Sequence, residues 1–140
     1  MTTVTDRAEW DRIAPGYDRT NTPTQMGIAG QGLSLAGLRS GMRFLDVAAG
    51  SGALSIPAAR IGAQVLAVDH SSAMLALLRR RAHEERLSVD TLVMDGHELE
   101  LDDNGFDLAG SQFESKKMEF VLVLLQSVHF QFQGRHGAGI

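Results

Sequence analysis

The alternation of short apolar runs with helical stretches constrains the fold of this chain more than any other feature. Apolar runs at 44–48, 65–68, 89–94 and 106–111 predict strands, and helical stretches separate the first three of them. This alternation is typical of an α/β protein, and continuously apolar strands fit a parallel sheet that is covered on both faces. The sequence therefore predicts a mostly parallel sheet of four to five strands with flanking helices.

Residues 1–40 precede the first predicted strand and contain two helical stretches. Spacings of three and four place four side chains on one face of the first stretch: Trp10, Ile13, Ala14 and Tyr17. Because Pro15 and Gly16 interrupt that face, we expect this helix to be short and broken. The second stretch follows Pro23 and is weakened by its glycines.

Two more helices are expected between the strands. The first ends at Gly62, and Pro57 makes it begin late or kink. Ser71 or Ser72 can cap the second helix. Its predicted apolar face consists of Met74, Leu77, Leu78 and Ala82.

Length, charge and composition exclude several classes of protein. A chain of 140 residues suits one domain, and a net charge of −4 argues against a nucleic-acid-binding protein. The absence of cysteine excludes disulfides, thiolate zinc sites and cysteine nucleophiles, and the scattered histidines predict no metal site. Apolar runs such as Phe120–Leu125 are far shorter than the ~20 residues of a membrane span. We therefore expect a cytoplasmic protein that contacts neither nucleic acid nor membrane.

The ends of three of the four predicted strands carry a carboxylate: Asp46, Asp69 and Asp95. Ligands of open α/β sheets bind outside the carboxyl ends of the strands. The glycine-containing loop at 48–52 leads into a helix N-terminus, which favours a carboxylate or phosphate. Asp69 is placed to accept hydrogen bonds from both ribose hydroxyls, and Asp95 to reach a base amino group. The pattern predicts a pocket for a nucleoside that carries an anionic group.

The loop motif distinguishes between cofactors. A dinucleotide fingerprint requires a third glycine or alanine where this chain has Ser55, so NAD-dependent reduction is disfavoured. The pattern that fits is D-x-A-x-G-x-G from Asp46 to Gly52, and it resembles motif I of class I S-adenosylmethionine-dependent methyltransferases. The segments at 68–75, 94–96 and 104–113 resemble later parts of that family. The opening at 10–18 resembles its small-molecule, ubiquinone-biosynthesis-like branch, and the whole resemblance covers residues 8–113.

The resemblance implies a cofactor, S-adenosylmethionine, and a role for each matching position. Ala48, Gly50 and Gly52 would face the methionine part, and Asp46 would order that loop and reach the cofactor amino group. Asp69 would hold the ribose. His70 would lie beside the adenine, and Asp95 and Gly96 would meet its edge. Ser111 and Gln112 would line the mouth of the site, where the methyl donor meets the methyl acceptor. Tyr17 would belong to a lid over the cofactor.

The resemblance also implies a Rossmann-like fold and an organisation of the chain. Residues 1–40 would be an N-terminal helical lid segment, and residues 41–113 the S-adenosylmethionine-binding core. Residues 114–140 are an atypical tail with room for one extra strand at 119–125, so we expect an incomplete version of the family's seven-stranded fold, truncated or altered after Phe113. An exposed sheet edge would allow a homodimer.

Methyl transfer from S-adenosylmethionine to a small-molecule acceptor is the function that this resemblance implies. The sequence identifies no catalytic base. The alternative is a catalytically incomplete fragment that binds S-adenosylmethionine or S-adenosylhomocysteine and either needs a partner or is inactive, because the tail departs from the family pattern.

Overall fold

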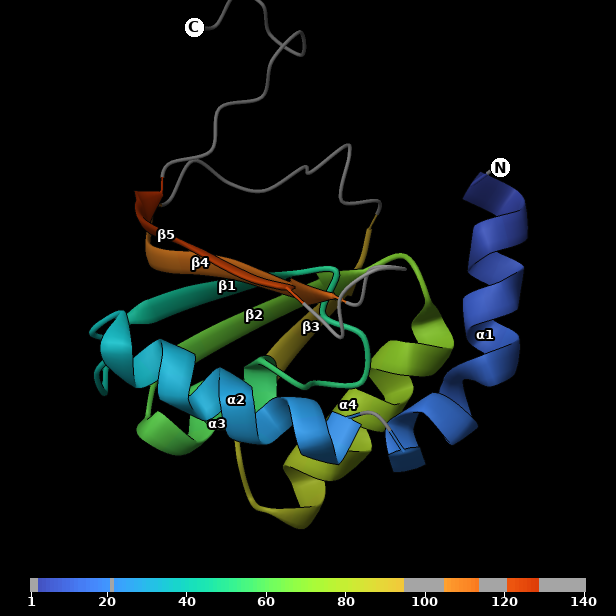
Figure 1. The fold of residues 1–140 in the computed structure, drawn as a ribbon, viewed down its shortest axis with the longest axis horizontal. Helices are drawn as coiled ribbons and strands as arrows, with labels where there is room; N and C mark the ends of the chain where they lie inside the picture. The colour runs from blue at the N-terminus through green and yellow to red at the C-terminus, as the bar shows by residue number, and fades with distance from the viewer. Residues whose placement is uncertain (1–2, 21, 95–104, 114–120, 129–140) are drawn as a thin grey trace, which may run out of the picture.

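The computed structural model describes residues 3–20, 22–94, 105–113 and 121–128 (Figure 1). Four helices and five strands lie in this part of the chain. In order they are α1 (Thr3–Thr20), α2 (Thr22–Leu35), β1 (Arg43–Val47), α3 (Ser55–Ile61), β2 (Gln64–Asp69), α4 (Ser72–Glu84), β3 (Val89–Val93), β4 (Phe106–Phe113) and β5 (Val121–Val128).

The strands form one sheet in the order β3-β2-β1-β4-β5. β1 pairs in parallel with β2 and β4, and β2 pairs in parallel with β3, whereas β5 runs antiparallel to β4. The predicted mostly parallel sheet of four to five strands is therefore confirmed. The direction of β5 follows from its connection, because the chain from Phe113 to Val121 is too short for the crossover of about a dozen residues that a parallel strand requires.

Helices α2, α3 and α4 lie together on one face of the sheet (Figure 1). Phe44 and Val65 point to this face and join the larger buried cluster with residues of α2 and α3, including Leu33 and Ala58. Because side chains alternate along a strand, the neighbouring residues point to the other face, where Leu45, Val68, Phe106 and Ala109 form a separate buried cluster. Both faces of the strands are thus apolar, as their uninterrupted runs predict.

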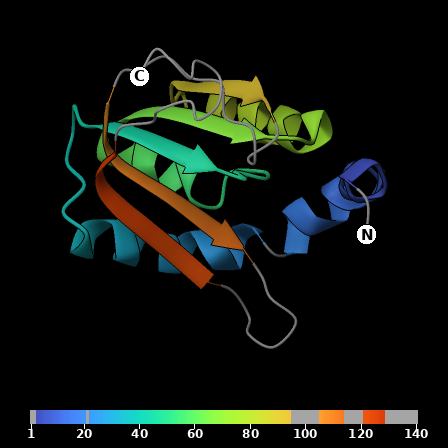
Figure 2. The same cartoon turned by 90° about the horizontal axis from the view of Figure 1, so that it is seen from above.

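Helix α1 differs from the helix that the sequence predicts. It is a single helix of 18 residues that contains Pro15, and not a short, broken one. Proline removes only one backbone hydrogen bond of a helix, and contacts with α4 supply compensating stabilisation. The carboxylate of Asp11 accepts from the hydroxyl of Ser71, and Asp18 pairs with the guanidinium of Arg81. Both views place α1 beyond the end of the sheet toward which the β1 to β4 arrows point (Figures 1 and 2).

The ends of α3 and α4 follow the predicted signals. α3 begins at Ser55, which places Pro57 in its first turn, and it ends at Gly62 with φ 107°. Ser71 caps α4, because its hydroxyl oxygen accepts a hydrogen bond from the backbone N–H of Met74 at 3.1 Å. The predicted apolar face of α4 was wrong at one position, since Leu75 is fully buried while Leu77 is only partly buried.

Candidate functional site

The loop after β1 opens at the carboxyl edge of the sheet. Three of its residues have left-handed backbone angles, with φ of 60° at Ala48, 59° at Gly50 and 104° at Gly52. The N–H of Ala49 donates to the carbonyl of Val68 at 2.9 Å, which ties the loop to the end of β2. A side chain added at Gly50 would meet nothing within 4 Å. The backbone of the loop at Gly50 therefore faces open space.

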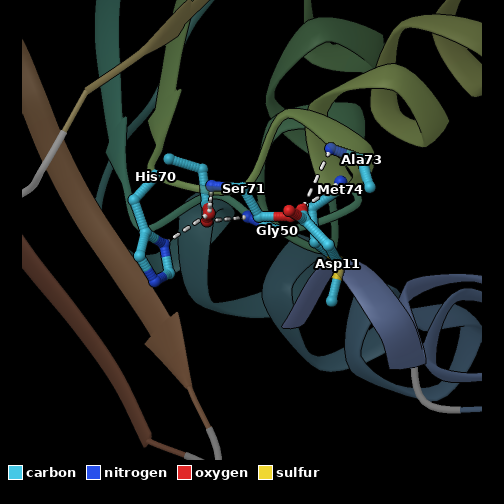
Figure 3. Close-up of polar contacts among 7 residues, drawn as sticks. Asp11, Gly50, His70, Ser71, Ala73 and Met74 are labelled. Atoms are coloured by element: carbon cyan, nitrogen blue, oxygen red, sulfur yellow. Dashed lines mark hydrogen bonds and ion pairs between the residues drawn. The ribbon is translucent and has the colours of Figure 1, made fainter. Parts of the chain in front are cut away.

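Asp69 connects this loop to the start of α4. Its Oδ2 accepts the backbone N–H of Gly50 at 2.8 Å, and its Oδ1 accepts the backbone N–H of Ser71 at 2.9 Å (Figure 3). The ring nitrogen Nδ1 of His70 lies 3.2 Å from the same Oδ1. A carboxylate has about four acceptor positions, so Oδ2 keeps one for a further donor. The side chain of Asp69 is nearly buried, whereas that of His70 is 24% exposed.

Asp46 is the deepest ionisable group of the site. It is fully buried, and its Oδ2 accepts the hydroxyl hydrogen of Ser55 at 2.6 Å. Its Oδ1 has no hydrogen-bond partner in the described part of the chain. Burial raises the pKa of Asp46 from 3.8 to about 7; the hydrogen bond from Ser55 opposes this rise, and the negative charge of Asp69 adds to it. Near neutral pH the site thus holds one carboxyl group whose charge is readily changed.

A second polar cluster lies where α1 meets α4 (Figure 3). Oδ1 of Asp11 accepts the hydroxyl hydrogen of Ser71 at 2.5 Å and the backbone N–H of Ala73 at 3.4 Å. The same Ser71 hydroxyl oxygen accepts from Met74. A chain of hydrogen bonds therefore runs from Asp11 through Ser71 to Asp69.

The structure brings most of the predicted site residues to one edge. Asp69 contacts Gly50 and lies beside His70, while Asp46 lies behind the loop that also contains Ala48 and Gly52. Ser111 follows Gly110, the β4 partner of Asp46, so it lies at the same end of the sheet, with Gln112 next on β4. Tyr17 belongs to α1, and only its backbone is described. Asp95 and Gly96 lie outside the described residues.

Four polar residues of the site were not identified as site residues from the sequence. Ser55, which was considered only as evidence against a dinucleotide fingerprint, is the hydrogen-bond partner of Asp46. Asp11 lies 60 positions from Ser71, and no local pattern indicates that the two meet. Ser51 in the loop and Thr22 on α2 are both buried, and their hydroxyl oxygens are 2.6 Å apart. Ser51 and Ser55 lie in or just after the glycine motif, which was the one signal available, whereas Asp11 and Thr22 had none.

These residues suit a nucleoside cofactor with an aminoacyl group. The open space at Gly50 admits a ligand close to the backbone, and Asp69 retains an acceptor position that a sugar hydroxyl can use. The partnerless Oδ1 of Asp46 is a buried acceptor for a cationic or neutral N–H donor. Among the described residues, no group of three or more histidines and carboxylates could hold a metal ion. No helix in the described part of the chain is long and apolar enough to cross a bilayer.

The chain is similar to known methyltransferases. A family model described as a methyltransferase domain matches residues 44–129. Demethylmenaquinone methyltransferase from Renibacterium salmoninarum is 38% identical over 110 residues, which cover 76% of this chain and 45% of that protein. The protein of the same name from Clavibacter sepedonicus is 38% identical over 112 residues, covering 76% and 44%. The chain thus spans less than half the length of these relatives.

Solved structures share the fold. Magnesium protoporphyrin IX methyltransferase from Synechocystis PCC 6803, with bound S-adenosylmethionine, aligns with a TM-score of 0.53 and 19% identity over 69% of this chain and 60% of that one. Phosphoethanolamine N-methyltransferase 1 from Haemonchus contortus aligns with a TM-score of 0.55 and 18% identity over 79% and 26%. The glycine loop, the acidic ends of β1 and β2 and the matched family model lead to one conclusion: the chain belongs to the class I S-adenosylmethionine-dependent methyltransferases.

Proposed function

We propose that this chain binds S-adenosylmethionine at the carboxyl edge of β1 and β2 and transfers its methyl group to a small-molecule acceptor. The observation that carries the proposal is the Asp69 carboxylate, which holds the N–H of Gly50 at 2.8 Å and keeps a further acceptor position beside the open loop. Both relatives named above are demethylmenaquinone methyltransferases, so demethylmenaquinone is the first acceptor to test.

Each residue has a task that its position supports. Asp69 would accept from the ribose hydroxyls, and His70, half-buried beside it, would lie along the adenine with Asp95 and Gly96. The loop of Ala48, Gly50 and Gly52 would face the methionine part. Asp46 would accept from the cofactor amino group through Oδ1, directly or through water.

The chemistry requires little of the protein beyond placement. When bound, S-adenosylmethionine supplies an electrophilic methyl group on a sulfonium centre, so the residues of the site bind, orient and exclude water. Ser111 and Gln112, at the carboxyl end of β4, would line the mouth where the acceptor enters. The part of the helical segment 1–40 around Asp11, which bonds to Ser71, would cover the cofactor. Tyr17 directly precedes Asp18, whose ion pair with Arg81 lies in the last turn of α4. An acceptor that arrives deprotonated needs no general base, and none is assigned.

A second reading follows from the antiparallel β5. The short connection from β4 replaces a parallel crossover in this chain, so the acceptor side of the site is built differently from a sheet that continues in parallel. The chain would then bind S-adenosylmethionine or S-adenosylhomocysteine without turnover, alone or with a partner. A homodimer through the edge of the sheet is one such assembly, and a cytoplasmic location fits either reading.

Two measurements on the purified chain separate these readings. Calorimetric titration with S-adenosylhomocysteine tests the pocket, with Asp69→Ala as the variant that should lose affinity. Transfer of a labelled methyl group to demethylmenaquinone and to a panel of hydroxylated small molecules tests the reaction. Binding with transfer supports the enzyme, binding without transfer supports the second reading, and a folded chain that does not bind refutes both.

A further inference from the structure

Helix α1 contacts α4 through two carboxylates on one of its faces. Asp11 and Asp18 are seven positions apart, about two helical turns, so they point in the same direction. Asp11 meets Ser71 and Ala73 at the beginning of α4, and Asp18 pairs with Arg81 in its last turn. The two helices therefore run in the same direction, and the residues of α1 before Asp11 extend past the beginning of α4.

The two contacts differ in what lies next to them. The Asp18–Arg81 pair lies at the end of α4 that is remote from the glycine loop. Asp11, in contrast, bonds to the residue whose own N–H holds Asp69. In Figure 3 the Asp11 carboxylate and His70 lie on opposite sides of Ser71. Only one of the two carboxylates is thus connected to the candidate site.

Asp11 adds to the cap that Ser71 provides for α4. The Ser71 oxygen accepts from the N–H of Met74, and Ala73 has its N–H directed at Asp11. A negative charge at a helix N-terminus is favourable, and here the charge comes from another helix. Because the Ser71 hydroxyl donates to Asp11 at 2.5 Å, its lone pairs stay turned toward Met74. The direction of this hydroxyl is therefore set by α1.

We propose that Asp11 is a positioning residue for the cofactor site. By holding Ser71 and the first turn of α4, it keeps the segment from Asp69 to Ser71 in the arrangement that receives the ribose and the adenine. The inference rests on the proposed function, and it gives α1 a specific role in cofactor binding through one carboxylate. Movement of α1 away from α4 would release Ser71 and loosen the hold of Asp69 on Gly50.

Matched variants test this role. Asp11→Ala should weaken the binding of S-adenosylhomocysteine roughly 5- to 20-fold. This is less than the loss expected for a direct charged contact with the cofactor, because Asp11 acts through Ser71. Asp18→Ala removes the carboxylate that pairs with Arg81 and should change affinity by less than about twofold, because Arg81 is remote from the loop. Asp11→Asn keeps an oxygen that can accept from Ser71 and should recover most of the lost affinity.

Amide hydrogen exchange provides a readout that does not depend on the cofactor. In Asp11→Ala the amides of Gly50, Ser71 and Met74 should exchange at least about tenfold faster than in Asp18→Ala, because their acceptors are no longer held. Equal exchange and equal affinity in the two variants would overturn the role of Asp11 while leaving the proposed function intact. If Asp11→Ala does not fold, Asp11→Leu and Asp18→Leu, which keep a branched side chain but remove the acceptor oxygens, form the same comparison.

A wild-type chain that folds but fails to bind S-adenosylhomocysteine would refute the proposed function, and with it the role of Asp11 toward the cofactor. A wild type that binds, together with an Asp11→Ala variant that binds equally well, refutes the positioning role alone. Weaker binding and faster exchange in Asp11→Ala, with neither in Asp18→Ala, is the result that the structure predicts.

Discussion

Replacement of Asp46 by asparagine should change the free energy of unfolding in a pH-dependent way. The stability of the variant relative to wild type should be higher in alkaline than in acidic solution. Burial raises the pKa of Asp46 from 3.8 to about 7 in the folded chain, against the smaller opposing effect of the Ser55 hydrogen bond. Between these two values unfolding releases a proton, so the free energy of unfolding of the wild type falls as pH rises. A difference of about three pKa units corresponds to about 4 kcal/mol. Below about pH 4 the residue is protonated in both states and contributes no pH dependence.

The asparagine side chain of the Asp46→Asn variant would remain neutral at every pH and could still accept the Ser55 hydroxyl. The stability of Asp46→Asn minus that of wild type should therefore grow by about 4 kcal/mol from pH 4 to pH 8, and then level off. Urea unfolding followed by circular dichroism at four pH values measures this difference. Asp90→Asn, which removes an exposed carboxylate of β3, is the control and should show a far smaller change. A difference that is flat, or that shrinks as pH rises, would refute the burial of an easily protonated carboxyl at the site.

Three further substitutions test the loop and the end of β2. Asp69→Ala should weaken the binding of S-adenosylhomocysteine roughly 10- to 150-fold in calorimetry, since charged hydrogen bonds contribute about 1.5–3 kcal/mol each; unchanged affinity in a folded variant would exclude Asp69 as the ribose ligand. Gly52→Ala should lower the unfolding free energy by about 1–3 kcal/mol, because φ is 104° and the new Cβ would lie 3.0 Å from side-chain carbons of Ile56 and Leu78. An unchanged free energy in urea unfolding would show that these two side chains move to make room for the Cβ. Gly50→Ala should cost only about 1 kcal/mol of stability, since its φ is 59° and no atom lies within 4 Å, yet it should reduce cofactor affinity by filling the open space; loss of stability without loss of affinity would contradict the assignment of that space.

The parallel core could be predicted because its signals are local. Uninterrupted apolar runs, the glycine at 62 and the serine at 71 each act within a few residues, and the structure has the expected strands, helix end and cap there. The positions of Asp46 and Asp69 at the ends of β1 and β2 follow from the same patterns. Their approach to one another follows from parallel pairing, which places both strand ends at one edge.

The features that escaped prediction depend on contacts between distant residues. Pro15 breaks an isolated helix, yet α1 is continuous because Asp11 and Asp18 bond to α4 from either side of the proline. The antiparallel direction of β5 is set by the length of a connection and not by the composition of the strand. The buried Ser51–Thr22 contact joins positions 29 apart and has no local sequence signal.

A titration of the isotopically labelled chain with S-adenosylhomocysteine, followed by amide chemical shifts, shows most directly where the nucleoside binds. We propose that it binds where the loop after β1 meets the end of β2. The largest shifts should fall on Gly50, Asp69, His70 and Ser71, while Gln64, at the opposite end of β2, should not move. An absence of shifts in a folded chain, or shifts centred on the opposite edge of the sheet, would contradict the account.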